Sequence, residues 1–154
     1  MRLNLYQKLC LTFYVFLVIF WILLFLSGSQ TGFYNYLYSF LFGLIPLIGG
    51  LIAMINSKLW GGLKSAIGKA VFFIGLGLFC WGVGETIWSY YNFFLGIPAP
   101  YPSLADIGFA PSIFFYGLGA AYLSTATGAK YGLRNPFAKI FIVAAPLAVL
   151  VLSY

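Results

Sequence analysis

The sequence predicts an all-α integral membrane protein, a bundle of five transmembrane helices. Of the 154 residues, 63% are hydrophobic and only 6% are charged, whereas a soluble domain carries about 25% charged residues. The hydrophobic residues form five runs, and a helix needs roughly 20 such residues to cross the hydrocarbon core of a bilayer. The Lys and Arg residues lie between or before these runs. Lipid is therefore the natural solvent for this chain.

The runs define a single transmembrane domain, residues 1–154, with short polar or glycine-containing connections. We expect helices at residues 9–26, 33–55, 70–95, 104–126 and 137–154. Pro46 and Pro111 lie inside the second and fourth runs, where each removes a backbone hydrogen bond and is expected to kink its helix. The last run ends without a polar tail. That ending fits a complete five-span protein or the N-terminal part of a longer one.

The basic residues predict the orientation of the bundle. They precede the first helix or lie around the second-to-third and fourth-to-fifth connections, as Arg2, Lys8, Lys58, Lys64, Lys69, Lys130, Arg134 and Lys139. The other two connections contain no Lys or Arg. Cytoplasmic loops carry the excess of basic residues, so we expect a cytoplasmic amino terminus and an external carboxyl terminus. The net charge of +6 then serves membrane orientation, and no nucleic-acid partner is expected.

Missing residue types exclude several classes of chemistry. The chain has no histidine, which excludes His-based metal sites, bis-histidine haem and Ser-His or Cys-His catalysis. Cys10 and Cys80 fall at different expected depths and are read as small apolar residues without a disulfide. No phosphate-binding loop or catalytic pair of carboxylates is present. The sequence therefore predicts no cofactor, no metal site and no enzymatic activity.

The candidate site centres on Glu85, an acidic residue inside the third expected helix. An ionisable side chain at membrane depth normally faces the bundle interior, a partner or a water-filled cavity. No Lys or Arg shares its depth, and desolvation without a cation favours the neutral carboxyl. Trp81 and Trp88, four residues before and three after Glu85, share its side of the helix. Aromatic rings beside a carboxylate suit an organic cation, whereas polar helix packing and an interfacial aromatic belt are the structural alternatives.

The other acidic residue, Asp106, has a structural explanation. Ser103 followed by Asp106 matches a capping box, which predicts that the fourth helix begins at Leu104. A negative charge in the first turn also suits the helix dipole. Tyr101 lies in the proline-containing loop just before this cap. If the loop reaches the Glu85 region, Asp106, Ser103 and Tyr101 would complete a ligand site near the outer face.

Small residues concentrate in the third and fourth helices. The third contains Gly75, Gly77, Gly82 and Gly84, and the fourth contains Gly108, Ser112, Gly117, Gly119 and Ala121. Small residues let helix backbones approach closely. We therefore expect helices two to four to pack tightly and to place Glu85 against a neighbour. The same faces are candidates for a homo-oligomer or for another membrane protein.

Two segments resemble a known type of membrane region. Glu85-Thr86-Ile87-Trp88 is followed by Pro100-Tyr101-Pro102-Ser103-Leu104-Ala105-Asp106. This pattern resembles the multi-spanning amino-terminal regions of bacterial sensor histidine kinases and diguanylate cyclase/phosphodiesterase proteins, over residues 81–116. The resemblance implies a sensory role in the bacterial inner membrane, with Glu85, Pro102, Ser103 and Asp106 as signature positions. The chain departs from those proteins because it has no kinase, cyclase or phosphodiesterase domain.

The sequence thus predicts a membrane-embedded sensory or ligand-binding module. Its expected ligand-binding residues are Glu85, Asp106, Trp81, Trp88, Tyr101 and Ser103. Two alternatives remain open. The chain would be a small proton-coupled transporter if Glu85 titrates during transport, or a structural subunit of a membrane complex if its glycine-rich faces bind partners.

Overall fold

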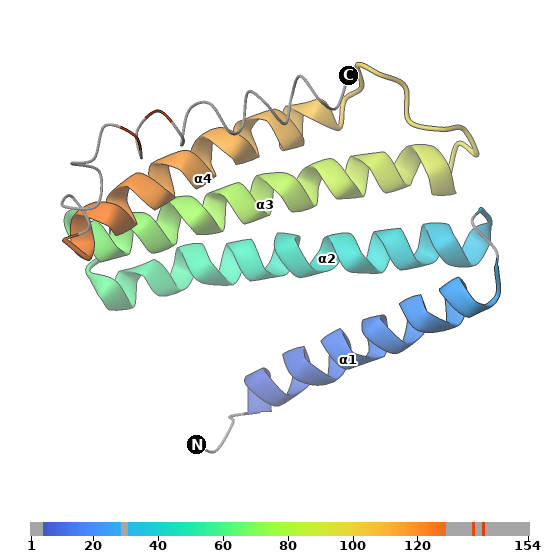
Figure 1. Cartoon of the computed structure of the whole chain (residues 1–154), viewed down its shortest axis with the longest axis horizontal. Coiled ribbons are helices and arrows are strands. Elements are labelled where there is room, and N and C mark those ends of the chain that lie inside the picture. Colours follow the sequence, from blue (N-terminus) through green and yellow to red (C-terminus); the bar gives the residue numbers. More distant parts are fainter. Residues whose placement is uncertain (1–4, 29–30, 129–136, 138–139, 141–154) are drawn as a thin grey trace.

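The computed structural model describes residues 5–28, 31–128, 137 and 140, and this part of the chain is helical with no strand (Figure 1). Its helices are α1 (Leu5–Leu26), α2 (Phe33–Asn56), α3 (Ala66–Phe93) and α4 (Asp106–Ala126). Two short 3-10 turns, η1 (Ser57–Trp60) and η2 (Gly62–Lys64), join α2 to α3. The fifth expected helix, 137–154, lies outside the described residues apart from positions 137 and 140. The all-helical prediction is confirmed.

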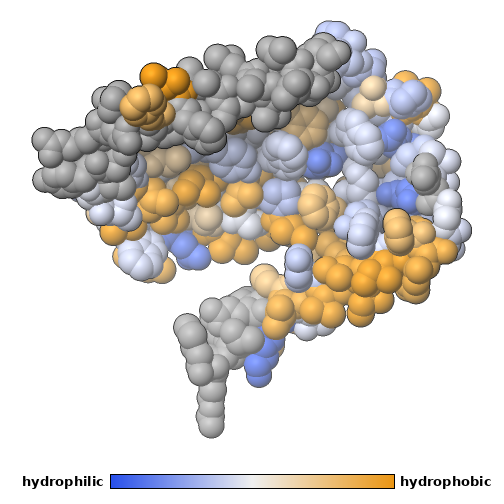
Figure 2. Space-filling view, in the orientation of Figure 1, coloured by the Kyte–Doolittle hydropathy of each residue, from blue (hydrophilic) through white to orange (hydrophobic). Residues whose placement is uncertain are grey.

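Each of the four helices in the described part is long and apolar enough to cross a membrane. Their surfaces show why water would not dissolve this fold. In α1 the side chains of Trp21, Leu23 and Phe25 are more than half exposed, and Leu17 is the one buried residue among those of α1 whose burial is described. Figure 2 shows hydrophobic side chains covering broad areas of the surface. Soluble monomers rarely expose contiguous apolar patches of more than a few hundred Å².

Three of the helices form a packed layer with α3 in the middle. Helices α2 and α4 lie on either side of α3 and run antiparallel to it, whereas α1, among the elements of the described part, contacts α2 alone (Figure 1). Because successive helices run in opposite directions, the η1–η2 connection, with Lys58 and Lys64, lies at one end of the layer. The loop 94–105 and the turn between α1 and α2 lie at the opposite end. We call these the lysine end and the loop end.

Small residues spaced seven apart create the contacts within the layer. The buried series are Gly43, Gly50 and Ser57; Gly68, Gly75, Gly82 and Ser89; Ala70, Gly77 and Gly84; and Ala105, Ser112 and Gly119. A seven-residue repeat keeps one face of a helix turned toward its neighbour along a left-handed crossing. Without side chains in the way, the backbones come close enough for dispersion contacts between whole helices.

The two series on α3 face different partners. A Cβ added at Gly82 would lie 2.4 Å from the Leu47 backbone nitrogen of α2, and one added at Gly84 would lie 2.7 Å from the Phe109 ring of α4. The predicted close packing of the second to fourth helices is confirmed. Among the glycines predicted to pack in the third and fourth helices, Gly117 is the one where an added Cβ meets nothing within 4 Å. Most of the glycines expected to serve partners therefore serve contacts within this chain.

Helix α3 begins four residues earlier than expected. The Ser65 hydroxyl accepts a hydrogen bond from the Gly68 backbone N–H (2.9 Å) and donates one to the Trp60 carbonyl. This N-cap starts the helix at Ala66. Gly68 packs against the backbone of Gly62 in the preceding turn. Gly68 and Lys69 were expected in the loop before the helix, because no sequence pattern reveals the contact between Gly68 and Gly62.

The starts of α1 and α4 also differ from the expected ones. Helix α1 begins at Leu5, because a helix can continue through the flanking Lys8 into the interfacial region. Helix α4 begins at Asp106, two residues after the expected Leu104. Only half of the predicted capping box forms: the Asp106 carboxylate accepts from the Ser103 backbone N–H at 2.7 Å, but the N-cap residue is Ala105, which has no side-chain cap hydrogen bond. The Ser103 hydroxyl accepts from the Ala105 N–H (3.2 Å), which holds the preceding turn outside the helix.

Candidate functional site

Glu85 lies on α3, in the part of the helix nearer the loop end. Eight residues separate it from Phe93 at the end of α3, which corresponds to roughly 12 Å along the helix axis. Across from it, α2 carries Gly43, where an added Cβ would lie 2.8 Å from the Glu85 Cβ. The absence of a side chain at Gly43 lets the α2 backbone pass directly beside the acidic residue. The carboxyl group is thereby placed at the junction of α2 and α3.

A cavity of about 340 Å³ opens beside this carboxyl group. It is lined by Tyr38, Ser39, Phe42, Glu85, Trp88 and Phe109, and we call it the Glu85 cavity. Its walls come from three helices, because α2 supplies the first three residues and α4 supplies the last. The site therefore exists only when α2, α3 and α4 are packed together.

Two aromatic pairs flank the carboxyl group. On the α2 side, the rings of Tyr38 and Phe42 stack with centroids 6.1 Å apart and an interplanar angle of 26°. On the α4 side, Trp81 meets Phe109 edge to face at 5.2 Å. Phe20 of α1 packs edge-on against Tyr38 at 5.8 Å and supports that wall from outside. The electron-rich faces of such rings attract cations.

The hydrogen-bonding groups around Glu85 are neutral. Trp81 lies one helical turn before Glu85 on α3 and brings its indole N–H to the neighbourhood of the carboxyl group, and Ser39 and Tyr38 bring hydroxyl groups to the cavity lining. Within the described ranges, no Lys or Arg forms an ion pair with Glu85, and the lysines of the η1–η2 connection lie at the lysine end. The described part of the site thus combines one carboxyl group with aromatic side chains and contains no cationic side chain.

The structure brings together three of the six residues expected at the site. Glu85 and Trp88 line one cavity, and Trp81 reaches the carboxyl group from one turn away. Both indoles are a little over one-third exposed, Trp81 at 37% and Trp88 at 38%, so they are accessible to a ligand in the groove between α2 and α4.

The remaining three expected residues lie outside the cavity lining. Asp106 and Ser103 bond to each other at the start of α4, and Tyr101 is 87% exposed in the preceding loop. Their contacts are those of a helix cap and a surface loop. Ligand binding by these three residues stays a prediction.

Sequence reasoning missed the residues that α2 and α4 contribute. Tyr38 and Phe42 are four residues apart, a spacing that places both on one face of a helix, and Phe109 follows Asp106 by three residues. These periodicities were visible in the sequence. Nothing in the sequence showed that this face of α2 turns toward Glu85, because that depends on the packing of Gly43 and Gly50 against α3.

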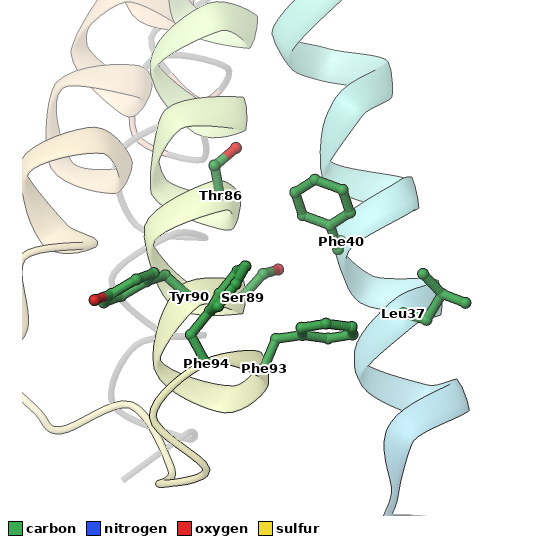
Figure 3. A pocket seen from close by; sticks show the side chains of 7 residues that line it. All are labelled: Leu37, Phe40, Thr86, Ser89, Tyr90, Phe93 and Phe94. Carbon is green, nitrogen blue, oxygen red and sulfur yellow. The ribbon is translucent and has the colours of Figure 1, made fainter.

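A further cavity lies between α2 and the loop-end part of α3 (Figure 3). It has a volume of about 210 Å³ and an almost wholly apolar lining made by Leu37, Phe40, Thr86, Ser89, Tyr90, Phe93 and Phe94. The Ser89 hydroxyl is buried and has no hydrogen-bond partner in the part of the chain that the structure describes. This cavity shares no residue with the Glu85 cavity and offers no charged group.

Metal binding and thiol chemistry have little support in the described residues. No group of three His, Cys, Asp or Glu side chains gathers there. Cys10 and Cys80 are both free thiols, one exposed and the other half-buried. A single carboxyl group provides too few ligands for a structural or catalytic metal site.

Comparisons with known proteins add no relative. No protein-family model matches the chain, and no curated protein or solved structure is detectably similar to it. The resemblance to bacterial sensor membrane regions therefore stays a prediction from two short segments.

Proposed function

We propose that this chain is a membrane-embedded ligand-binding module with a sensory role, and that its ligand is an organic cation held in the Glu85 cavity. The observation that carries the proposal is a carboxyl group flanked by two aromatic pairs, roughly 12 Å from the end of α3. A carboxylate at membrane depth is unfavourable without a partner. A bound cation would supply that partner and would also contact the ring faces.

The proposed orientation follows from the distribution of charge. Lys58 and Lys64 at the lysine end would face the cytoplasm under the positive-inside rule, so the amino terminus would be cytoplasmic. The Glu85 cavity, being nearer the loop end, would then face the external leaflet of a bacterial inner membrane. A sensory role is supported by the resemblance around Glu85-Thr86-Ile87-Trp88 and the Pro100–Asp106 loop. Signal output would require a partner protein or an additional domain.

The test uses the chain in nanodiscs with Trp21 and Trp60 replaced by Phe, so that Trp81 and Trp88 report through their fluorescence. Propylamine and tetramethylammonium are the probes, and propanesulfonate is the anionic control. We expect a saturable change with both cations and none with the anion. Glu85→Gln keeps the size and hydrogen-bonding capacity of the side chain but removes its charge. It should weaken cation binding by at least about tenfold, equivalent to about 1.4 kcal/mol.

A proton-coupled carrier is distinguished from this proposal by transport. In proteoliposomes a carrier would move the bound cation across the membrane, and Glu85→Gln would abolish the flux. The sensory module should bind the cation and give no flux. Saturable binding that is equal in the parent chain and in Glu85→Gln would refute both roles for this carboxyl group.

A further inference from the structure

A larger cavity, distinct from the one in Figure 3, adjoins the Glu85 cavity on the same face of the helical layer. It has a volume of about 540 Å³ and is lined by Phe42, Ile45, Pro46, Gly49, Leu78, Trp81 and Tyr116. We call it the Leu78 cavity. Phe42 lines both cavities, and Trp81, which lines the second, reaches the carboxyl group in the first.

One face of α3 forms the floor of both cavities. Leu78, Trp81, Glu85 and Trp88 are separated by three, four and three residues, the spacing that keeps side chains on one side of a helix. Ten residues from Leu78 to Trp88 correspond to roughly 15 Å along the axis. The two cavities are therefore consecutive sections of one groove between α2 and α4.

The two sections differ sharply in chemistry. The Glu85 cavity contains the carboxyl group and the hydroxyls of Ser39 and Tyr38. The Leu78 cavity has no charged residue and is mainly apolar, with Ile45, Pro46 and Leu78 in its lining; its polar groups are the Tyr116 hydroxyl and the Trp81 indole N–H. Gly49 lines this cavity, and an added Cβ there would meet nothing within 4 Å. A polar section nearer the loop end thus continues into an apolar section deeper in the bundle.

We infer that the groove takes an amphipathic organic cation, with its charged nitrogen in the Glu85 cavity and a single apolar tail in the Leu78 cavity. This inference rests on the proposed function and adds the tail to it. A cationic headgroup can form an ion pair with ionised Glu85 and cation–π contacts with the rings, whereas an anionic or neutral headgroup would gain neither. The order of the two sections, head nearer the loop end and tail deeper, matches that of an amphiphile inserted from the adjacent leaflet.

The experiment compares a short and a long amine on a groove that has been filled at its apolar end. Propylamine occupies the head section alone, whereas octylamine also requires the tail section. Gly49→Leu places a side chain in the Leu78 cavity at a position with open space. Gly117→Leu is the matched control, because Gly117 is equally open and lines neither section of the groove. Leu78→Phe enlarges the side chain at the floor of the same cavity as a second variant and adds no tryptophan to the fluorescence signal.

The expected result is a selective loss. Gly49→Leu and Leu78→Phe should weaken octylamine binding by about tenfold, the scale on which a pocket rejects a methylene group that does not fit. Propylamine binding should stay unchanged. Gly117→Leu should change neither. All proteins are studied in nanodiscs of one lipid composition, so partition of octylamine into the bilayer cancels in the comparison.

Three other outcomes separate the two proposals. If propylamine binding depends on Glu85 but the filled groove binds both amines normally, the tail site is wrong and the cation site stands. If filling the Leu78 cavity weakens both amines equally, the variants have disturbed the head section and the proposed division of the groove is wrong. If neither amine binds in a Glu85-dependent way, the proposed function fails and the tail site fails with it.

Discussion

Two neighbouring glycines of α2 provide a sharp test of the helix packing on which the Glu85 cavity depends. Gly50 is buried against α3, and a Cβ added there would lie 2.4 Å from the Phe79 backbone nitrogen and 2.5 Å from the Gly75 carbonyl oxygen. At Gly49, one residue earlier, an added Cβ would meet nothing within 4 Å. Alanine at these two positions is the same chemical change in the same helix.

The expected magnitudes follow from these distances. An ordinary van der Waals contact begins near 3.4 Å. Alanine at position 50 therefore requires the α2 and α3 backbones to separate by about 1 Å. A gap of that size loses about a quarter to a half of the dispersion attraction between the facing atoms. Overpacking of this kind destabilises by about 1–3 kcal/mol. Gly49→Ala replaces a flexible residue by a better helix former, so the free energy of unfolding should stay unchanged or rise by up to about 1 kcal/mol.

The assay is equilibrium unfolding in mixed micelles of dodecyl maltoside and SDS, followed by tryptophan fluorescence. Gly50→Ala should lower the free energy of unfolding, whereas Gly49→Ala should not. Cation binding in the Glu85 cavity should weaken with Gly50→Ala, because Tyr38 and Phe42 move away with α2. Equal effects of the two alanines on the free energy of unfolding would refute the close approach of α2 to α3 at Gly50.

Two further predictions concern the α4 cap and the orientation. Asp106→Ala removes the acceptor of the 2.7 Å bond from the Ser103 N–H and should lower the free energy of unfolding by about 0.5–1.5 kcal/mol, the usual net contribution of a hydrogen bond. Asp106→Asn keeps an acceptor and should cost less. Hydrogen exchange at the Ser103 amide reports the loss, and an equal cost for both variants would contradict a stabilising role for this bond. In a chain without its native cysteines, an impermeant thiol reagent added to intact cells should label Tyr101→Cys and spare Leu59→Cys, whose parent side chains are 87% and 81% exposed. The reverse labelling would invert the proposed orientation.

The elements of the fold were largely predictable because lipid imposes few solutions. A chain with so little charge and such long apolar runs must satisfy its backbone hydrogen bonds within each span, which leaves helices as the simple outcome. The α2 range was predicted to within one residue, and α4 ends where expected. The starts of α3 and α4 were wrong because each depends on a hydroxyl contact, made by Ser65 and Ser103 respectively. Hydropathy carries no information about such contacts.

The candidate site was only half predictable. Glu85, Trp81 and Trp88 could be grouped from the sequence because they share one face of one helix. Their partners on α2 and α4 could not, since helix spacing does not say which helices touch or in which register. The seven-residue repeats of small residues, such as Gly75 and Gly82, were a usable signal for that register. They became meaningful only once their contacts with α2 were known.

The sequence by itself determined that this chain has spans suited to lipid, roughly where the four described helices lie, and which helix carries the unusual acidic residue. These properties are local, since composition sets the solvent and hydrogen bonding within each segment sets its secondary structure. The tertiary structure alone decided that Gly43 passes beside Glu85, that Tyr38, Phe42 and Phe109 surround it, and that the groove continues to Leu78. Those contacts join residues far apart in the chain. They depend on dispersion forces between whole helix faces, which act only when the backbones can approach closely.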